Sequence, residues 1–461
     1  PTRFKPPLFL RCGPMLRYCG LRREVPRNSS NSSNQEREIW RGSVMIVCQD
    51  SHSSYELAPT LRLFLQPVDL LPPRPTGKDG SQLAPEYFDP IAGLSRIGRD
   101  GRTLYVRSIE EIDIERDLSR EESADGLYDM NRIQPSEKIN SKSFQKSFYD
   151  GEKAGKYKEV RGFRLHTEQG MTFWRFNLEI ELRENQQRIA YRINRGPASG
   201  FWVPPRGRGM NIMFYGCNSF GRNVNFDKLC GPDPMWRDVL NTHQTHPFHV
   251  MLGGGNQICN DDVIHVSPAL KAWLDIRDSN SKAHHPFSSR LQHELEAFYL
   301  NHYCMWFSQG LFGLAVSQIP MVNMLADNDI AYGFGSRYDR FMCSPVFSGV
   351  CAVAFKYYML FQHQSSIDEG EDTEPSWILG EKLGPLIPEL SRTIFTRLGR
   401  TIAFLGLDCR TEMTPNQIIR AETSRKIFER LQKKVIRGDT KHLLVLMSIP
   451  HAHLRPAWLE K

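Results

Sequence analysis

The stretch MLGGGNQICNDDV, residues 251–263, decides the fold, because an apolar run ends there in three glycines and a polar cluster. Glycines at a strand end allow a close approach of the backbone to a ligand. The residues that follow have amide, thiol and carboxylate side chains, which are ligand types for ions. Asn256 is neutral where a charged ligand would be expected. The stretch therefore indicates a working site, a weakened site or only a turn.

Outward from this stretch, residues 206–461 alternate between short apolar runs and helical patterns. This alternation predicts an α/β domain with a buried sheet that is at least partly parallel. Ligands of such sheets bind beyond the carboxyl ends of the strands. The expected strands are NIMFYG, FHVMLGGG, VNML, AFLGL and KHLLVLMSIP, and the expected helices lie near residues 290–309, 348–363 and 416–434.

Four expected strands end in residues with oxygen, nitrogen or sulfur groups, and together these residues suit a metal site that handles an oxyanion. Taken singly, an aspartate after a strand is more often a turn former or a helix cap. A cysteine in this position is more often buried packing. Both interpretations remain open on the residues alone. The candidates are Cys217, then Asn256 with Cys259, Asn260 and Asp261, then Asp327 with Asn328, and finally Asp408 with Arg410.

The N-terminal half has a different pattern. Residues 1–39 show no sustained periodicity and are predicted to be an irregular segment. Residues 40–205 are predicted to form a β-rich antiparallel domain, closed by a linker rich in glycine and proline. Its clearest strand is FWRFNLEIEL, in which apolar and polar residues alternate, and RIAYRIN after it predicts a hairpin.

Composition sets further limits. The chain has 461 residues, a formal net charge of +7 and ten cysteines without a CxxC pair. The basic residues are dispersed, which gives no indication of nucleic-acid binding and suits small anionic substrates. Scattered cysteines favour reduced thiols and an intracellular protein. No apolar run reaches the ~18 residues of a membrane span, whereas peripheral association with a membrane stays open.

The segments GGGNQICND, DNDIAYGFGSRYDRFMCSPVFSG, FKYYMLFQHQ and FLGLDCRTE resemble the fungal PhoD-like phosphatases of the calcineurin-like metallophosphoesterase superfamily. The resemblance implies an α/β fold of stacked sheets flanked by helices, the metallophosphoesterase-type sandwich, after an antiparallel β-rich domain. It implies a metal cluster of iron with calcium. It also implies hydrolysis of phosphate mono- or diesters, with a phosphorylated small molecule or a lipid head group as substrate.

The resemblance assigns metal ligands to positions of this chain. Cys217 keeps the family's cysteine ligand, and Asp327 and Asp408 keep aspartates. Asn256 stands where the family has a carboxylate that bridges two metals, and Cys259 stands where it has a tyrosine ligand. An amide oxygen carries no charge and bridges two cations poorly, so we expect weaker metal binding.

The resemblance also assigns catalytic and substrate-binding positions. Arg410 keeps an arginine that stabilises phosphoryl charge, and Asn260 and Asp261 keep a turn that faces the substrate. Asn328 replaces a histidine that helps the leaving group, a loss of about 100- to 10,000-fold in rate. A later Gly-Asp-Val-His motif is expected after Lys461, which would leave the domain incomplete. The resemblance thus implies an impaired phosphoesterase or, alternatively, a non-catalytic module that binds an anion or a partner.

Overall fold

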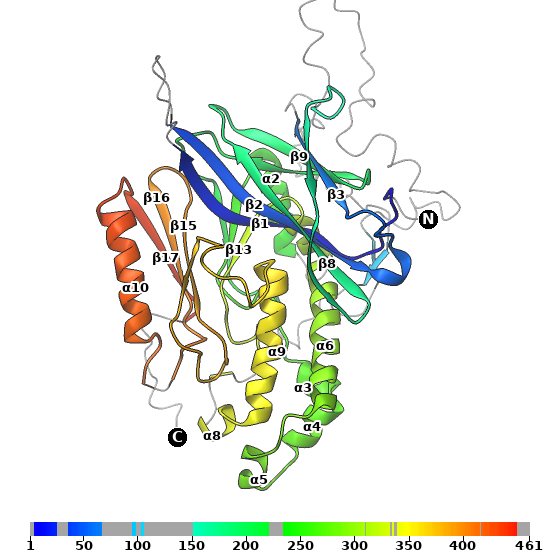
Figure 1. Ribbon diagram of the computed structural model, residues 1–461, viewed down its shortest axis with the longest axis vertical. Coiled ribbons are helices and arrows are strands. Elements are labelled where there is room, and N and C mark those ends of the chain that lie inside the picture. The colour runs from blue at the N-terminus through cyan, green and yellow to red at the C-terminus, as the bar shows by residue number, and fades with distance from the viewer. Residues whose placement is uncertain are drawn as a thin grey trace, which may run out of the picture.

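The computed structural model shows a mixed α/β chain with several sheets and covering helices (Figure 1). It describes residues 4–24, 36–66, 95–97, 103–105, 151–220, 234–308, 310–331, 334–335, 339–414 and 416–449. Within these residues no helix is long and apolar enough to cross a membrane. The described cysteines are free thiols, in agreement with the prediction from their spacing.

One large sheet joins both halves of the chain. The strands β11, β12 and β13 are parallel neighbours at one edge of this sheet. Strand β1 is parallel to β13, and Arg17 of β1 pairs with Met321 of β13. The remaining strands continue antiparallel. The order is β11 (Ile212–Tyr215), β12 (Val250–Gly253), β13 (Met321–Asn323), β1 (Leu10–Glu24), β2 (Arg37–Gln49), β8 (Met171–Glu181) and β7 (Phe163–Glu168).

The strand β1 lies where an irregular segment was predicted over residues 1–39, and this prediction is wrong for Leu10–Glu24. Gly13 and Gly20 have φ angles of 92° and 132°, and the pairing with β2 shifts register near both. These bulges break the alternation by which a strand is recognised in a sequence. The large sheet therefore crosses the boundary predicted at residues 205 and 206.

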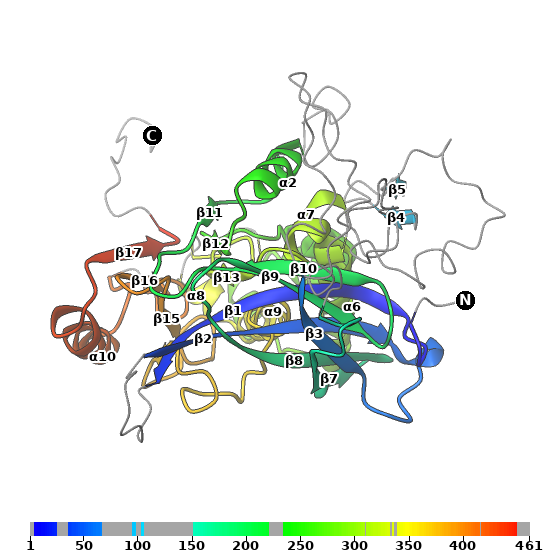
Figure 2. The same ribbon diagram turned by 90° about the horizontal axis from the view of Figure 1, so that it is seen from above.

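A second sheet packs against the β1, β2 and β8 part of the large sheet (Figure 2). The rings of Trp40 and Phe201 lie between the two layers, with 5.2 Å between their centroids. The alternation predicted for β8 is confirmed by its burial, but the predicted hairpin is wrong, because β8 and β9 belong to different sheets. The second sheet has the order β10 (Ala198–Val203), β9 (Gln187–Ile193), β3 (Thr60–Gln66) and β6 (Tyr157–Arg161).

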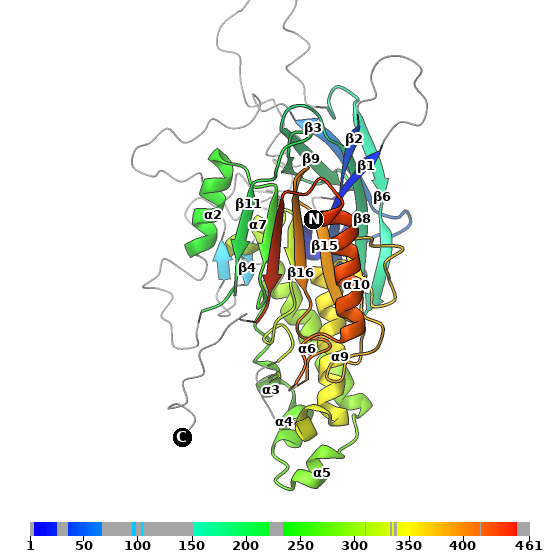
Figure 3. The ribbon, with the colours of Figure 1, turned by 90° about the vertical axis from the view of Figure 1, so that its left-hand side faces the viewer.

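A third sheet lies beside the first three strands of the large sheet (Figure 3). A Cβ atom on Gly406 would lie 2.3 Å from the sulfur of Met324, so the two sheets are in close contact. Helix α10 (Ala421–Leu431) packs on the other face of the third sheet through Ile427. The strands are β14 (Trp377–Leu379), β15 (Arg392–Arg397), β16 (Ile402–Leu407) and β17 (His442–Met447), of which the last two are parallel.

The helices α6 (Ser289–Ser308) and α9 (Pro345–Gln362) run side by side (Figure 1), and both were predicted. Ser344 caps α9 by accepting the backbone N–H of Phe347 at 3.3 Å, and Pro345 suits the first helical position. Most of α9 is apolar and buried, as expected of a helix in the interior.

Shorter elements complete the fold. Helix α2 lies between β11 and β12, and most of the other short helices lie between β12 and α9. They are α2 (Pro234–Thr245), α3 (Val263–Val266), α4 (Pro268–Leu274), α5 (Ser279–Ala283), α7 (Gly310–Val316), α8 (Asp339–Met342), η1 (Asp50–His52), η7 (Gln432–Ile436), β4 (Ser95–Ile97) and β5 (Thr103–Tyr105).

Candidate functional site

The carboxyl ends of the parallel strands β12, β13, β16 and β17 meet in one place. A Cβ atom on Gly255, after β12, would lie 2.5 Å from the Cβ of Ala326, after β13, and 3.5 Å from that of Ser448, after β17. Arg410, after β16, donates from Nη2 to the backbone oxygen of Ser448 at 3.1 Å. These loops form the strand-end cluster, which contains Cys217, Asn256, Asp327, Asn328, Asp329, Asp408 and Arg410.

The glycines of the turn after β12 have a structural reason that the sequence did not reveal. A Cβ atom on Gly253 would lie 2.5 Å from Oδ1 of Asn323 and 2.8 Å from Nε2 of Gln257. Gly255 has a φ of 116° and lies against Ala326. Both glycines are therefore needed for packing between neighbouring loops. Their role as an approach path for a metal-bound phosphate stays a prediction.

Asn256 is the centre of the strand-end cluster. Its φ of 57° is a left-handed conformation, which asparagine tolerates better than most residues. Its Oδ1 accepts the backbone N–H of Asn328 at 3.0 Å, and its Nδ2 lies 3.8 Å from Sγ of Cys217. The neutral side chain thus connects the loops after β11, β12 and β13.

Asp329, which was not among the predicted site residues, joins the loops after β12 and β13. Its Oδ2 accepts the backbone N–H groups of Ala326 and Asn256 at 2.9 Å and 3.0 Å, and its Oδ1 accepts Nε2 of Gln362 at 3.1 Å. Burial raises the pKa of Asp329 to about 7, against the lowering effect of these hydrogen bonds. A signal was present in the sequence, because Asp329 directly precedes the apolar pair Ile330 and Ala331.

The predicted substrate residues have different surroundings. Asn260 is fully buried, and its Nδ2 donates to the backbone oxygen of Asp329 at 2.7 Å. Its backbone N–H also donates to the oxygen of Asn328 at 3.0 Å. Asp261 is partly buried and interacts with Cys259. In the structure, Asn260 therefore connects two loops of the strand-end cluster.

The two predicted cysteine ligands differ in exposure. Cys217 is exposed and has a φ of 61°, and its backbone N–H donates to the oxygen of Gly255 at 3.0 Å. Cys259 is partly buried, and burial raises the pKa of its thiol to about 11. In the absence of a metal, a thiol with such a pKa is protonated at neutral pH, and a cation bound here would have to displace the thiol proton.

Asp408 organises the loop after β16. Its Oδ1 accepts the backbone N–H groups of Arg410 and Thr411, both at 3.0 Å. Its Oδ2 accepts the backbone N–H of Arg392 at 2.9 Å and the hydroxyl of Thr411 at 2.7 Å. Because both oxygens already accept two hydrogen bonds, the carboxylate has little capacity left for a cation.

Arg410 and Asp327 meet at the rim of the strand-end cluster. Nη2 of Arg410 lies 3.8 Å from Oδ1 of Asp327, and their side chains are 12% and 39% exposed. The Nε of Arg410 is buried and has no hydrogen-bond partner among the described residues. The structure therefore brings together an arginine with spare donor capacity and a carboxylate that is accessible from solvent.

Comparison with known proteins connects the chain to a phosphatase family. A family model described as PhoD related phosphatase matches residues 206–460. An uncharacterized protein of Saccharomyces cerevisiae is 33% identical over 311 residues, which are 62% of this chain and 44% of that protein. The chain thus spans less than half the length of this curated relative. A solved structure of PhoD covers 93% of this chain and 61% of its own chain, with 10% identity and a TM-score of 0.37.

Proposed function

The chain belongs to the PhoD-related phosphatase family, and we propose that its strand-end cluster binds the phosphoryl group of a phosphate ester and hydrolyses it only weakly. The observation that carries this proposal is the side chain of Asn256, which hydrogen-bonds the backbone of Asn328 and lies 3.8 Å from the sulfur of Cys217. A neutral carboxamide occupies the position in which the resemblance expects a carboxylate that bridges two metals.

Arg410 is the residue that we propose to bind the phosphoryl oxygens. Its guanidinium is held at the cluster by the hydrogen bond to Ser448 and keeps an unpartnered Nε among the described residues. Guanidinium groups bind two oxygens of a phosphate through their planar array of donors. A bound phosphoryl group would replace the weak contact with Asp327, whose nearest atoms are 3.8 Å apart.

The donor set does not fit the iron and calcium that the resemblance implies. No group of three or more His, Cys, Asp or Glu residues in the described part of the chain could hold a metal ion. Both oxygens of Asp408 already accept hydrogen bonds, and Asn256 supplies a neutral amide where the resemblance expects a carboxylate. Of the predicted ligands, Asp327 has the most accessible carboxylate.

Asn328 supports the proposal of weak hydrolysis, because it stands where the resemblance expects a proton-donating histidine. A carboxamide does not exchange a proton at neutral pH, so this residue supplies no general acid for the leaving group. In this proposal the substrate is a phosphorylated small molecule or a lipid head group, because only the phosphoryl oxygens are recognised by the residues described above.

A non-catalytic binding module is the second candidate. It is favoured by the hydrogen bonds of Asn256 and Asp329, which join the loops after β12 and β13, and by those of Asp408, which hold the loop after β16. The two candidates differ in one respect. An impaired enzyme regains turnover when the missing charged and proton-transferring groups are restored, and a binding module does not.

The experiment is hydrolysis of p-nitrophenyl phosphate and bis-p-nitrophenyl phosphate with iron and calcium supplied, together with elemental analysis of the purified protein. The test variant is Asn256→Asp combined with Asn328→His. Asn301→Asp is the matched control, since Asn301 is exposed on α6 and gains the same charge outside the cluster. We expect the double variant to exceed the wild type in rate by about 100-fold or more.

The outcomes separate the candidates. Equal rates of the wild type and the double variant, both well above background, would refute the impairment. Metal uptake without turnover in the double variant would favour the binding module. A gain in Asn301→Asp equal to that of the double variant would show that charge in general, and not the strand-end cluster, causes the effect.

A further inference from the structure

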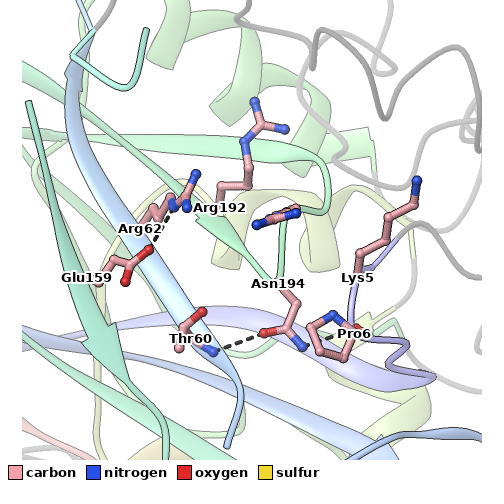
Figure 4. Close-up of a pocket in the computed structure, with 8 residues that line it drawn as sticks. Lys5, Pro6, Thr60, Arg62, Glu159, Arg192 and Asn194 are labelled. Carbon is pink, nitrogen blue, oxygen red and sulfur yellow. Dashed lines mark hydrogen bonds and ion pairs between the residues drawn. The ribbon is translucent and has the colours of Figure 1, made fainter. Parts of the chain in front are cut away.

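A polar pocket lies on the sheet formed by β10, β9, β3 and β6, and none of its lining residues belongs to the strand-end cluster (Figure 4). Its volume is about 380 Å³, within the range of small-molecule sites. The strands β3, β6 and β9 and the N-terminal residues 5–6 line it. The phosphoester proposal does not involve this pocket.

The pocket has an excess of positive charge. Lys5, Arg62, Arg192 and Arg195 line it, and among the described residues Glu159 is the only carboxylate that does so. Figure 4 shows Lys5 on the opposite side of the pocket from Arg62 and Glu159. Cations that surround a recess from several sides raise the local concentration of anions more than the same charges dispersed over a surface.

Two of the arginines are fixed by one carboxylate. Nε of Arg192 lies 3.0 Å from Oε2 of Glu152, and Nη1 of Arg62 lies 3.3 Å from Oε1 of the same residue. Nη1 of Arg192 also donates to the backbone oxygen of Gly196 at 2.7 Å. These contacts hold both guanidinium groups at the wall of the pocket, so a ligand would meet them already oriented.

The other two cations have no such neutralisation. Among the described residues, neither the ammonium of Lys5 nor the guanidinium of Arg195 has an ion-pair partner. Their backbone is nevertheless fixed by the buried Asn194, whose Oδ1 accepts the N–H of Thr60 at 2.9 Å and whose Nδ2 donates to the oxygen of Pro6 at 3.1 Å. Arg195 follows with a φ of 56°, so the turn carries it in one defined conformation.

Glu159 is the carboxylate that a bound anion can displace from Arg62. Its carboxylate lies 2.9 Å from Nε of Arg62, but its side chain is 50% exposed. An exposed ion pair of this kind contributes little net free energy, because both groups are well solvated when apart. An anion with more charge than one carboxylate could therefore take the place of Glu159 at Arg62.

From these observations we propose that the pocket binds a multiply charged, phosphate-bearing anion through Lys5, Arg195 and Arg62. The ligand has more than one phosphate group, because Lys5 and Arg62 lie on opposite sides of the pocket (Figure 4). This chemistry is shared by a free polyphosphate and by a phosphorylated lipid head group. The site is independent of the strand-end cluster and of its proposed function.

The test is isothermal titration calorimetry of the full chain with sodium tripolyphosphate and, separately, with orthophosphate. The test variant combines Lys5→Gln with Arg195→Asn, since asparagine tolerates the left-handed conformation at that position. We expect tripolyphosphate to bind more tightly than orthophosphate, and the variant to lose about tenfold or more in affinity. Raising the salt concentration should weaken binding to the wild type, because exposed charges are screened.

The matched control combines Arg183→Gln with Arg206→Gln, which removes two positive charges from another polar pocket of about 410 Å³. We expect this control to keep the wild-type affinity, and Glu159→Gln to bind about threefold more tightly because the competing carboxylate is gone. An equal loss in both double variants, or no loss in Lys5→Gln with Arg195→Asn, would overturn the proposal. Far-ultraviolet circular dichroism establishes that each variant is folded.

A vesicle arm distinguishes the two sources of the ligand. The vesicles contain phosphatidylcholine with phosphatidylinositol bisphosphate, and a second set has the same charge supplied by phosphatidylserine. Binding to the first set only, lost in the test variant, supports the pocket with a lipid head group as ligand. Tripolyphosphate binding without vesicle binding supports the pocket with a soluble ligand. Binding to both sets that the test variant retains would overturn the proposal.

Discussion

Asp329 accepts the backbone N–H of Asn256 at 3.0 Å, although the two residues are 73 positions apart in the chain. The same carboxylate oxygen accepts the N–H of Ala326 at 2.9 Å. One buried side chain therefore sets the relative position of the loops after β12 and β13. The geometry of the strand-end cluster depends on Asp329, the member of the cluster whose side chain is fully buried.

Replacement of Asp329 should separate these two loops. In Asp329→Ala, the N–H groups of Ala326 and Asn256 lose their buried acceptor, and we expect the free energy of unfolding to fall by about 3 kcal/mol. In Asp329→Asn, one oxygen can still accept both, and the unpartnered Oε1 of Gln362 can accept from the new amide after a flip. The loss should then be smaller. Urea denaturation of both variants measures the difference, and equal losses would contradict this account.

The buried carboxyl of Asp329 should also make stability depend on pH. Burial raises its pKa from 3.8 to about 7, so the folded chain keeps a proton that the unfolded chain releases. The stabilising contribution is complete below about pH 4 and is lost as the pH rises through 7. Relative to Asp329→Asn, the wild type should lose up to about 1.4 kcal/mol per pH unit in this range. The measurement is urea denaturation of both proteins at several pH values. A difference in their free energies of unfolding that stays constant between pH 4 and 8 would refute this pH dependence.

Gly255 should not tolerate a side chain. In Gly255→Ala the new Cβ would lie 2.5 Å from that of Ala326, in a backbone conformation with φ 116°. We expect a loss of about 3 kcal/mol in the free energy of unfolding. Gly155→Ala is the control, since Gly155 has a φ of 70° with no atom within 4 Å of the added Cβ. The control should lose about 1 kcal/mol, from backbone strain alone.

The ion pair of Arg17 and Glu374 should contribute to stability only while both partners are present. Their nearest atoms are 3.0 Å apart, and the side chains are 7% and 8% exposed. Glu374→Ala leaves a buried charge and should cost about 3 to 5 kcal/mol, whereas Arg17→Met with Glu374→Leu should recover most of this loss. The exposed pair of Arg37 and Glu181 is the comparison, and removing it should cost less than about 1 kcal/mol. Thermal denaturation measures all three changes.

Asp408 offers a test of its assigned role as a metal ligand. If its main role is to organise the loop, Asp408→Ala lowers the free energy of unfolding by about 3 kcal/mol, because the N–H groups of Arg392, Arg410 and Thr411 lose an acceptor. The metal content of the folded variant should then equal that of the wild type. If Asp408→Ala clearly lowered the metal content without lowering the free energy of unfolding, Asp408 would be a metal ligand and this account of its role would be wrong.

Much of the fold was predictable because its signals are local. Helix α9 is a long apolar run after a serine cap and a proline, and β8 alternates between apolar and polar residues. Strand β1 was missed because glycine bulges interrupt its pattern. The hairpin was predicted wrongly because neighbouring strands in sequence can join different sheets, and the sequence contains no direct record of that choice.

By itself, the sequence determined the family, five of the strands and the longest helices of the C-terminal half, and which side chains follow those strands, since these depend on residue type and local spacing. It did not indicate β14 and β15. The tertiary structure alone decided how those side chains are used. In the folded chain, Asp408 accepts a hydrogen bond from the backbone of Arg410 in its own loop. Asn256 accepts the backbone N–H of Asn328, and Asp329 accepts the backbone N–H of Asn256. The physical reason is that hydrogen bonds and pKa values depend on neighbours distant in sequence, which only the packed chain brings together.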